Sequence, residues 1–129
     1  MIGWIDLFMS TYNRHFGNWG EQIAAQFLEM HGFVILDRNY RTPYGEIDII
    51  VQKEDLIVFV EVKTRSGNAF GMPEDAITPQ KREHLTQSAL HYLQQNEGKI
   101  TDWRIDVISI LRDKGQSKPE VTWFENALV

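Results

Sequence analysis

The chain has 129 residues and a hydrophobic content of 43%, which is enough for one compact domain with a real core. It contains no cysteine, so disulfides, thiolate zinc sites and cysteine nucleophiles are excluded. The formal net charge of −5 argues against general nucleic-acid binding, which favours a basic surface.

The longest apolar run covers only residues 56–60, far below the ~20 residues that a helix needs to span a bilayer. No basic stretch precedes an apolar core, as it would in a signal peptide. We therefore expect no membrane partner. The lack of cysteine fits a reducing compartment, and we expect a cytoplasmic protein.

Residues 1–16 form an amphipathic segment that precedes the main domain, which we assign to residues 17–129. Apolar residues recur in the segment at spacings of three or four, as on one face of a helix, at Ile5, Phe8, Tyr12 and Phe16. The segment has little Lys or Arg, which disfavours a helix on a membrane surface. We expect the apolar stripe to pack on the domain itself or on a second subunit.

A helix is predicted from Trp19 to Met30, with Asn18 as its N-cap and Gly32 as its C-terminal stop. Glu21 lies three residues after Asn18, as in a capping box. The same residue shares a helix face with alanine and leucine side chains that should pack on a sheet. Its carboxylate can therefore either cap the helix or reach the ends of the strands.

Apolar patterns predict five strands, over residues 33–39, 46–51, 56–64, 103–111 and 121–128. The second and third are joined by a short polar loop, which indicates a hairpin. A further helix should begin at Thr78 and Pro79, because the hydroxyl caps the helix and proline suits its first position. The resulting order of elements indicates an α/β fold with a mixed β-sheet flanked by helices.

Three charged residues lie in predicted strands that otherwise resemble a core. Asp48 is surrounded by isoleucine and valine, and Glu61 and Lys63 follow a continuous apolar run. Side chains two residues apart in a strand share a face, so Glu61 and Lys63 point the same way. Because a strand buried on both faces rarely carries charge, these residues point to a metal, a substrate phosphate, or both.

Neighbouring strands would bring Asp48 and Glu61 together, and two carboxylates ~5 Å apart repel by roughly 3 kcal/mol at an effective dielectric of ~20. Mg²⁺ or Mn²⁺ would relieve this repulsion, and Mg²⁺ usually keeps waters that a phosphate can replace. Lys63 could then position or deprotonate a water, or neutralise charge in the transition state. The alternative is that Glu61 and Lys63 form a surface pair at a frayed strand end, with Asp48 in a turn.

Basic residues lie close to this acidic pair in the sequence. Arg41 and Arg65 each lie just outside a predicted strand, and Lys81 lies in the first turn of the second helix. Each could contact nucleic-acid phosphates, and each could equally be a solvated surface residue. Arg104 and Asp106 share one strand face, and for them we expect a structural salt bridge. The four histidines have no metal-ligand spacing, and we expect them at the surface or partly packed.

A larger set of residues between Gly17 and Ile110 has a recognisable arrangement. It consists of Gly20-Glu21, Ala24, Leu28, Gly32, Asn39, Arg41, Gly45-Glu46-Ile47-Asp48, Phe59-Val60-Glu61-Val62-Lys63, Arg65, Phe70-Gly71, Lys81 and Arg104 with Asp106-Val107. This arrangement resembles the YraN family of small bacterial proteins. That family in turn is similar to Holliday-junction-resolvase-type endonucleases of the PD-(D/E)xK, restriction-endonuclease-like fold.

The resemblance implies a restriction-endonuclease-like nuclease domain over residues 17–129. It makes Asp48 and Glu61 the metal carboxylates, with the Val62 backbone carbonyl as a further ligand. It also makes Lys63 the catalytic lysine and Glu21 an acid of the first helix that supports the metal or its water. Lys81 becomes an accessory residue of the site.

We therefore expect a Mg²⁺- or Mn²⁺-dependent endonuclease that acts on branched or otherwise structured DNA. A two-fold junction suits a homodimer, and the N-terminal segment could supply its interface. Two alternatives stay open. One is a nucleic-acid-binding module that has lost catalysis. The other is an interaction or scaffold protein whose charges form a structural network, with no metal and with Lys63 paired directly to Glu61 or Asp48.

Overall fold

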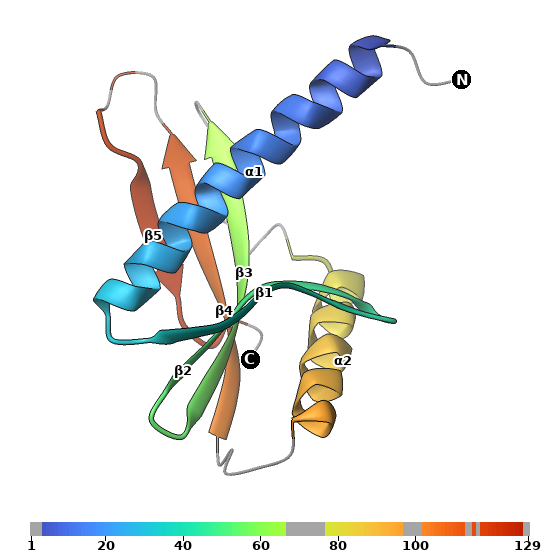
Figure 1. Cartoon of the computed structure of the whole chain (residues 1–129), viewed down its shortest axis with the longest axis vertical. Helices are drawn as coiled ribbons and strands as arrows, with labels where there is room; N and C mark the ends of the chain where they lie inside the picture. Colours follow the sequence, from blue (N-terminus) through green and yellow to red (C-terminus); the bar gives the residue numbers. More distant parts are fainter. Residues whose placement is uncertain (1–3, 67–76, 97–101, 113–114, 116, 128–129) are drawn as a thin grey trace.

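The computed structural model describes residues 4–66, 77–96, 102–112, 115 and 117–127, with side chains from residue 17 onward. Within these residues, two helices flank a five-stranded sheet (Figure 1). The elements in chain order are α1 (Trp4–Met30), β1 (Val34–Thr42), β2 (Gly45–Lys53), β3 (Leu56–Ser66), α2 (Pro79–Gln95), β4 (Asp102–Arg112) and β5 (Glu120–Phe124). The predicted α/β class and the mixed sheet are confirmed.

The strands follow one another across the sheet in chain order, β1-β2-β3-β4-β5. β3 and β4 run parallel, and all other neighbouring strands are antiparallel. A parallel pair needs a long crossover, and here the crossover carries α2. β3 and β4 pair along their whole length, from Leu56 opposite Asp102 to Ser66 opposite Arg112, and they form the centre of the sheet.

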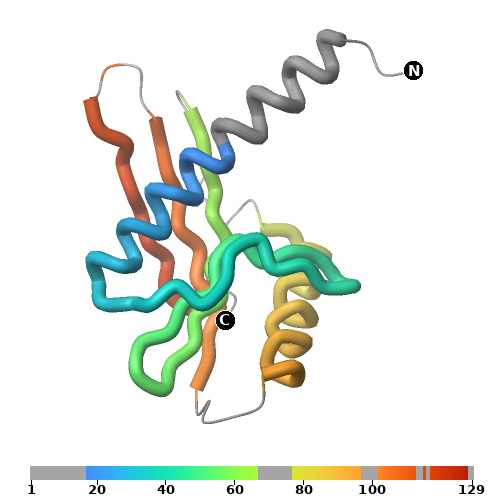
Figure 2. Tube along the Cα trace, in the orientation of Figure 1, coloured from blue at the N-terminus to red at the C-terminus, as the bar shows by residue number. Residues whose placement is uncertain are grey.

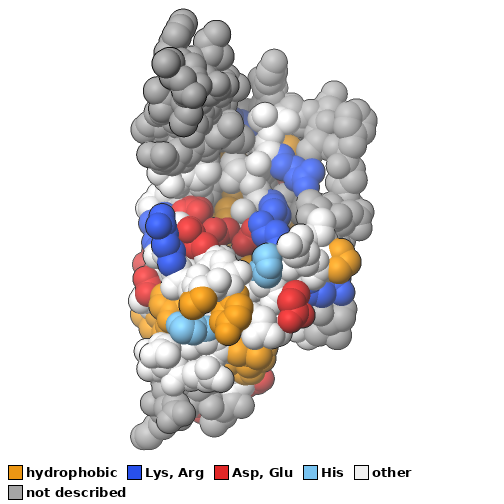
Figure 3. All heavy atoms as spheres, turned by 90° about the vertical axis from the view of Figure 1, so that its right-hand side faces the viewer, with side chains coloured by type: hydrophobic (Ala, Val, Ile, Leu, Met, Phe, Trp, Pro, Cys, Tyr) orange, Lys and Arg blue, Asp and Glu red, His pale blue; other side chains and the backbone are white. Residues whose placement is uncertain are grey.

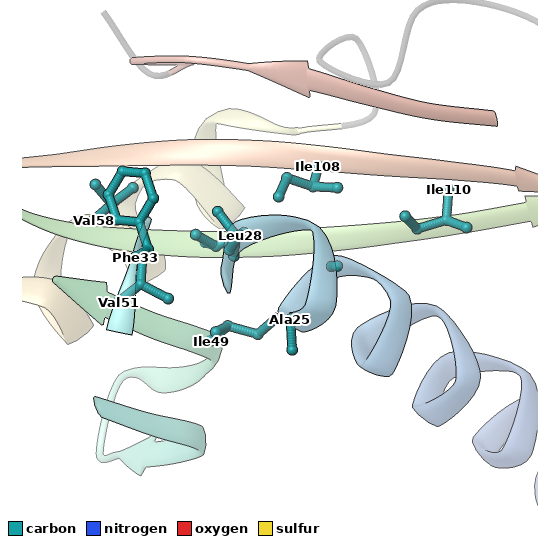
Figure 4. Close-up of a cluster of buried hydrophobic side chains, with 10 residues drawn as sticks. Ala25, Leu28, Phe33, Ile49, Val51, Val58, Ile108 and Ile110 are labelled. Carbon is teal, nitrogen blue, oxygen red and sulfur yellow. The ribbon is translucent and has the colours of Figure 1, made fainter. Parts of the chain in front are cut away.

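The core has two layers because β3 is buried on both faces. Consecutive residues of a strand point to opposite faces, so Val60 contacts the cluster beneath α1 while Phe59 contacts the cluster beneath α2. Figure 4 shows the α1 layer, in which Leu28 of the helix lies against the sheet. In the α2 layer, Leu85 and Ala89 pack on the opposite face.

The first helix is continuous from Trp4 to Met30, so the prediction that a helix begins at Trp19 with Asn18 as its N-cap is wrong. The capping role considered for Glu21 is excluded with it. The sequence explains the continuity, because no proline intervenes and apolar residues keep the helical spacing at Phe16, Trp19, Ile23 and Phe27. The packing predicted for the stripe of residues 1–16 concerns side chains outside the described residues.

The predicted helix ends further along the chain are confirmed. Gly32 adopts a φ of 88°, and the Phe33 N–H donates to the Leu28 carbonyl, which ends α1. Thr78 caps α2 by accepting the Lys81 N–H at 3.1 Å, and Pro79 is the first helical residue. The outer strands differ from the prediction by a few residues, since β1 runs on to residue 42 and β5 ends at residue 124.

The hairpin of β1 and β2 leaves the sheet at its far end. Pairing between β2 and β3 stops at Ile49 opposite Val60, whereas β1 and β2 remain paired as far as Thr42 and Gly45. The far end of the hairpin lies beside α2 (Figures 1 and 2), where the hydroxyls of Thr42 and Ser88 are 2.8 Å apart. A fork therefore opens between β2 and β3. No helix in the described part of the chain is long and apolar enough to cross a membrane.

Candidate functional site

Asp48 lies where β2 parts from β3. It precedes Ile49, the last β2 residue paired with β3, and the same register continued by one step would place it opposite Glu61. The departure of β2 removes a strand partner from β3 at this point. The Val62 backbone N–H donates instead to Asp48 Oδ2, at 2.8 Å. A backbone donor near the core needs an acceptor, and the Asp48 carboxylate supplies one.

Glu61 is the buried acid of the site, with only 5% of its surface exposed. Its Oε1 atom lies 2.6 Å from Lys81 Nζ and 3.4 Å from Lys63 Nζ. Glu61 lies within β3, which stays paired to β4 as far as Ser66, and Asp48 lies within β2. The alternative of a surface pair at a frayed strand end, with Asp48 in a turn, is therefore wrong.

A pocket of about 440 Å³ opens over the two acids. The sheet contributes Asp48 and Glu61 to its lining, the hairpin contributes Gly45 and Glu46, and α2 contributes residues of its first two turns, including Lys81 and His84. Figure 3 shows acidic side chains gathered on the face that carries this end of α2, with basic side chains on both sides of them. Two of the predicted acids, Asp48 and Glu61, and the predicted basic residue Lys81 thus meet at one concave surface.

Two further carboxylates, Glu21 of α1 and Glu46 of β2, are held together by the side chain of Asn39. The amide nitrogen of Asn39 donates to Glu21 Oε2 at 3.3 Å and to Glu46 Oε1 at 3.0 Å, in the amide orientation that satisfies its neighbours. Asn39 adopts a φ of 54°, a left-handed conformation that asparagine tolerates better than most residues. Arg38 adds a long ion pair to Glu21, with Nη2 and Oε2 3.9 Å apart.

The close approach of α1 to β3 brings Glu21 beside the fork. Gly20 faces Thr64 so closely that a Cβ atom on Gly20 would overlap the Thr64 hydroxyl. Only glycine therefore allows the helix to lie at this distance from the strand. The next residue, Glu21, is then near enough for its charge to raise the pKa of Asp48.

Burial is the main influence on the two acids of the site whose pKa values shift, Asp48 and Glu21. Burial and, after it, the Glu61 carboxylate raise the pKa of Asp48 to about 8, against the opposing effect of the Val62 N–H. Burial also raises the pKa of Glu21, and Glu46 adds to this rise while Arg38 opposes it. A carboxyl with a raised pKa is one whose charged form lacks compensation, and a bound cation would provide it.

The pKa values of the two lysines at Glu61 shift in opposite directions. Burial lowers the pKa of Lys63, and the neighbouring Lys81 ammonium lowers it further. Burial also acts to lower the pKa of Lys81, but its hydrogen bond to Glu61 and the charge of that carboxylate outweigh burial and raise it. Lys63 is therefore the lysine that gives up a proton more readily, and Lys81 is the one that stays charged.

The remaining predicted residues differ in their distance from the pocket. Arg41 is exposed on β1, and its Nε atom lies 3.6 Å from Glu46 Oε2, at the rim. Arg65 lies beyond Lys63 on β3, opposite Leu111, and is not among the described residues that line the pocket.

Arg104 and Asp106 form the structural salt bridge that the sequence predicts. Arg104 Nε lies 3.1 Å from Asp106 Oδ1, and the Asp106 side chain is fully buried. The same carboxylate accepts the Trp123 indole N–H and the Asn126 backbone N–H, each at 2.8 Å. Asp106 thereby attaches the C-terminal turn to the sheet.

Reasoning from the sequence missed Glu46, Asn39 and His84 as residues of the site. Glu46 and Asp48 are two apart in β2, a spacing that could have suggested a shared environment. The role of Asn39 follows from its left-handed backbone and from its place beside the fork, and the sequence shows neither. His84 is exposed, as expected, but it also lines the pocket, where its Cβ faces Gly45.

The donors at the fork suit a hard divalent cation. Asp48 and Glu61 offer carboxylate oxygens. Val62 lies next to Glu61 in the strand, and its N–H donates to Asp48. In the described part of the chain no group of three or more His, Cys, Asp or Glu side chains is arranged to hold a metal. Mg²⁺ rarely needs such a cage, because it is usually bound by one or two carboxylates, waters and substrate phosphates. The residues present therefore fit Mg²⁺ or Mn²⁺.

Comparison with known proteins identifies the family. The family model described as "Uncharacterised protein family UPF0102" matches residues 20–110. This span includes the last part of α1, all of β1, β2, β3 and α2, and most of β4. A UPF0102 protein of Syntrophomonas wolfei is 48% identical over 106 residues, which cover 82% of this chain and 92% of that protein. A UPF0102 protein of Dehalococcoides mccartyi is 39% identical over 119 residues, covering 92% and 97% of the two chains. The chain therefore belongs to the UPF0102 family.

Proposed function

We propose that this protein is a metal-dependent endonuclease that hydrolyses phosphodiester bonds in branched or otherwise structured DNA. The observation that carries the proposal is the meeting of Asp48, Glu61 and Lys63 at the fork between β2 and β3. Two acids on adjacent strands next to a lysine make a site that can bind a cation, a phosphate and a water together. The restriction-endonuclease-like arrangement implied by the sequence resemblance supports the same reading.

Asp48 and Glu61 would hold Mg²⁺ or Mn²⁺ with the Val62 carbonyl. When bound, such an ion polarises a phosphoryl oxygen and lowers the pKa of a coordinated water. Asp48 is prepared for this role by the Val62 N–H, which fixes one of its oxygens at 2.8 Å. Glu21 accepts a hydrogen bond from Asn39 and would support the ion or its water.

Lys63 would act on the proton of the attacking water. Its pKa is lowered, chiefly by burial, so its neutral form is more accessible than that of an exposed lysine. A general base works best when its pKa lies near the working pH. After proton transfer, the Lys63 ammonium would offset the charge of the pentacovalent phosphorus centre.

Basic residues at the rim would hold the DNA backbone. Arg41 is exposed beside Glu46 on one side of the pocket. Lys81 lies on the other side, on α2, where its ammonium is 2.6 Å from Glu61 Oε1. Arg65 extends β3 beyond Lys63 and would contact a more distant phosphate. Figure 3 shows basic side chains flanking the acidic centre, a distribution that suits a polyanion despite the net charge of −5.

A branched substrate with two-fold symmetry would require two sites, and we propose a homodimer formed through the apolar stripe of residues 1–16. Deleting Met1–Ser10 should then shift the protein towards monomer in light-scattering chromatography. A chain that is already monomeric at high micromolar concentration would exclude the dimer. A nuclease that acts on single strands or flaps would then be the better proposal.

Two alternatives predict different behaviour. The ion pairs of Glu61 with Lys63 and Lys81 are what a scaffold protein with a structural charge network would contain. Such a network does not explain why an aspartate with a raised pKa stands at position 48. An asparagine would accept the Val62 N–H at no electrostatic cost. A nucleic-acid-binding module without catalysis would bind DNA, and its affinity would not depend on either acid.

The decisive experiment combines metal binding with cleavage. Calorimetry with Mn²⁺ should show binding to the wild type that Asp48→Asn weakens at least tenfold. A panel of duplex, flap and four-way-junction DNA should be cleaved with Mg²⁺ or Mn²⁺ by the wild type and not by Glu61→Ala. The wild-type protein without metal and the Asp102→Ala variant, changed at an exposed acid outside the pocket, serve as controls. Absence of metal binding would favour the scaffold, and metal binding without cleavage would favour the binding module.

A further inference from the structure

One carboxylate oxygen in the site is shared by two ammonium groups. Glu61 Oε1 lies 2.6 Å from Lys81 Nζ and 3.4 Å from Lys63 Nζ, while the Glu61 side chain is only 6% exposed. The Lys81 side chain is 40% exposed, so its ammonium reaches inward from the pocket to a buried acid. In this arrangement Lys81 is the cation closest to Glu61.

The two lysines differ in their freedom to leave Glu61. Lys63 comes from the same strand and the same face as Glu61, two residues away, so its position follows that of the acid. Lys81 comes from the first turn of α2, and its flexible stem borders a pocket of about 440 Å³. Rotation of that stem would carry the ammonium out of the fork and along the pocket, without any movement of the helix.

We propose that Lys81 occupies Glu61 in the metal-free protein and transfers its ammonium to a substrate phosphate when a divalent cation takes its place at the acid. The inference rests on the proposed function. A hard cation and an ammonium compete for the same carboxylate oxygen, and their like charges repel in a partly buried site. Lys81 thus holds the Glu61 carboxylate in place in the metal-free protein. It becomes a phosphate contact only when the metal is present.

This role reverses the usual effect of removing a residue from a site. If Lys81 only positioned Glu61 as a structural partner, its loss would leave the acid less ordered and would weaken metal binding. If Lys81 competes with the metal, its loss frees the carboxylate and strengthens metal binding. The sign of the change in affinity therefore separates the two roles.

The first test is calorimetry with Mn²⁺ on the full chain. Lys81→Met should bind Mn²⁺ about tenfold tighter than the wild type, a difference of ~1.4 kcal/mol. The matched control is Lys53→Met, because Lys53 donates to the His31 carbonyl away from the pocket, and its affinity should equal that of the wild type. Circular dichroism checks folding, and Lys81→Gln replaces the methionine variant if that variant does not fold.

The outcomes are distinct. No Mn²⁺ binding by either the wild type or the Lys81 variant would overturn the proposed function itself. Equal or weaker binding by the Lys81 variant, with clear binding by the wild type, would overturn the competition while leaving the metal site intact. Tighter Mn²⁺ binding by Lys81→Met, with the affinity of Lys53→Met equal to that of the wild type, supports the inference.

The second test addresses the transfer to phosphate, with a fluorescently labelled four-way DNA junction as the probe. With Ca²⁺, which binds oxygen ligands and can hold DNA without rapid cleavage, Lys81→Met should reduce junction affinity about fivefold in anisotropy measurements. With EDTA, the same variant should stay within about twofold of the wild type, because Lys81 is then engaged by Glu61. An equal loss of affinity under both conditions would show that Lys81 is always free to contact DNA and would overturn the proposal.

Discussion

The Asp48 carboxylate accepts the Val62 backbone N–H at 2.8 Å and so replaces a strand partner that β3 lacks at this point. The contact joins the two sides of the fork, because Asp48 belongs to the strand that leaves and Val62 to the strand that stays. It also fixes one carboxylate oxygen next to Glu61. The same structural break that opens the pocket therefore positions the acid within it.

The first prediction concerns stability against pH. Burial and the Glu61 carboxylate raise the pKa of Asp48 from 3.8 to about 8, so the folded state holds a proton more strongly than the unfolded state. The cost of ionising Asp48 therefore grows from about pH 4 and levels off above about pH 8. In EDTA, Asp48→Asn should be more stable than the wild type by on the order of 2 kcal/mol at pH 9, with little difference at pH 4. Urea unfolding at several pH values measures the free energy of unfolding of both proteins. A difference between them that does not change with pH would contradict the prediction.

The second prediction concerns Lys63 and the chemical step. Lys63→Ala should lower the single-turnover cleavage rate by roughly 100-fold or more while changing DNA affinity less than about twofold, because proton transfer matters only in the transition state. Lys63→Arg keeps the positive charge but cannot lose a proton at neutral pH, so it should not restore the rate. A loss of affinity with an unchanged rate would instead assign Lys63 to ground-state phosphate binding.

The third prediction concerns the approach of α1 to β3. Gly20→Ala should destabilise the protein by about 1–3 kcal/mol, because the new Cβ overlaps the Thr64 hydroxyl. Gly17→Ala is the matched control on the same helix, since no atom lies within 4 Å of a Cβ at that position. It should stabilise the protein by ~0.5–1 kcal/mol through helix propensity. Thermal unfolding compares the two variants, and adding Thr64→Ala to Gly20→Ala should recover part of the loss.

The fourth prediction separates the structural acid from the acids of the site. Asp106→Ala should cost about 3 kcal/mol, because it leaves Arg104 and two N–H donors without their buried acceptor. Asp102→Ala, at an exposed acid of the same strand, should change stability by less than about 0.5 kcal/mol. Neither variant should alter Mn²⁺ affinity when folded. Altered Mn²⁺ binding by folded Asp106→Ala would show that the buried salt bridge is linked to the metal site.

The sequence alone was sufficient for the features that depend on neighbouring residues. Alternating apolar residues indicated the strands, Thr78 and Pro79 indicated the start of α2, and the spacing of Glu61 and Lys63 placed both on one face. These features are local because strand and helix periods act over a few residues. The same kind of reasoning failed at Asn18, where a plausible cap lies inside a helix whose apolar stripe continues on both sides.

Only the tertiary structure decided which residues meet at the fork. Lys81 reaches Glu61 because parallel pairing of β3 with β4 makes the intervening α2 lie against the sheet. Asn39 joins Glu21 to Glu46 because α1, β1 and β2 converge where the hairpin leaves β3. Such contacts depend on the packing of whole elements and on the point at which two strands part. They are set by the free energy of the assembled core, which no local sequence pattern encodes.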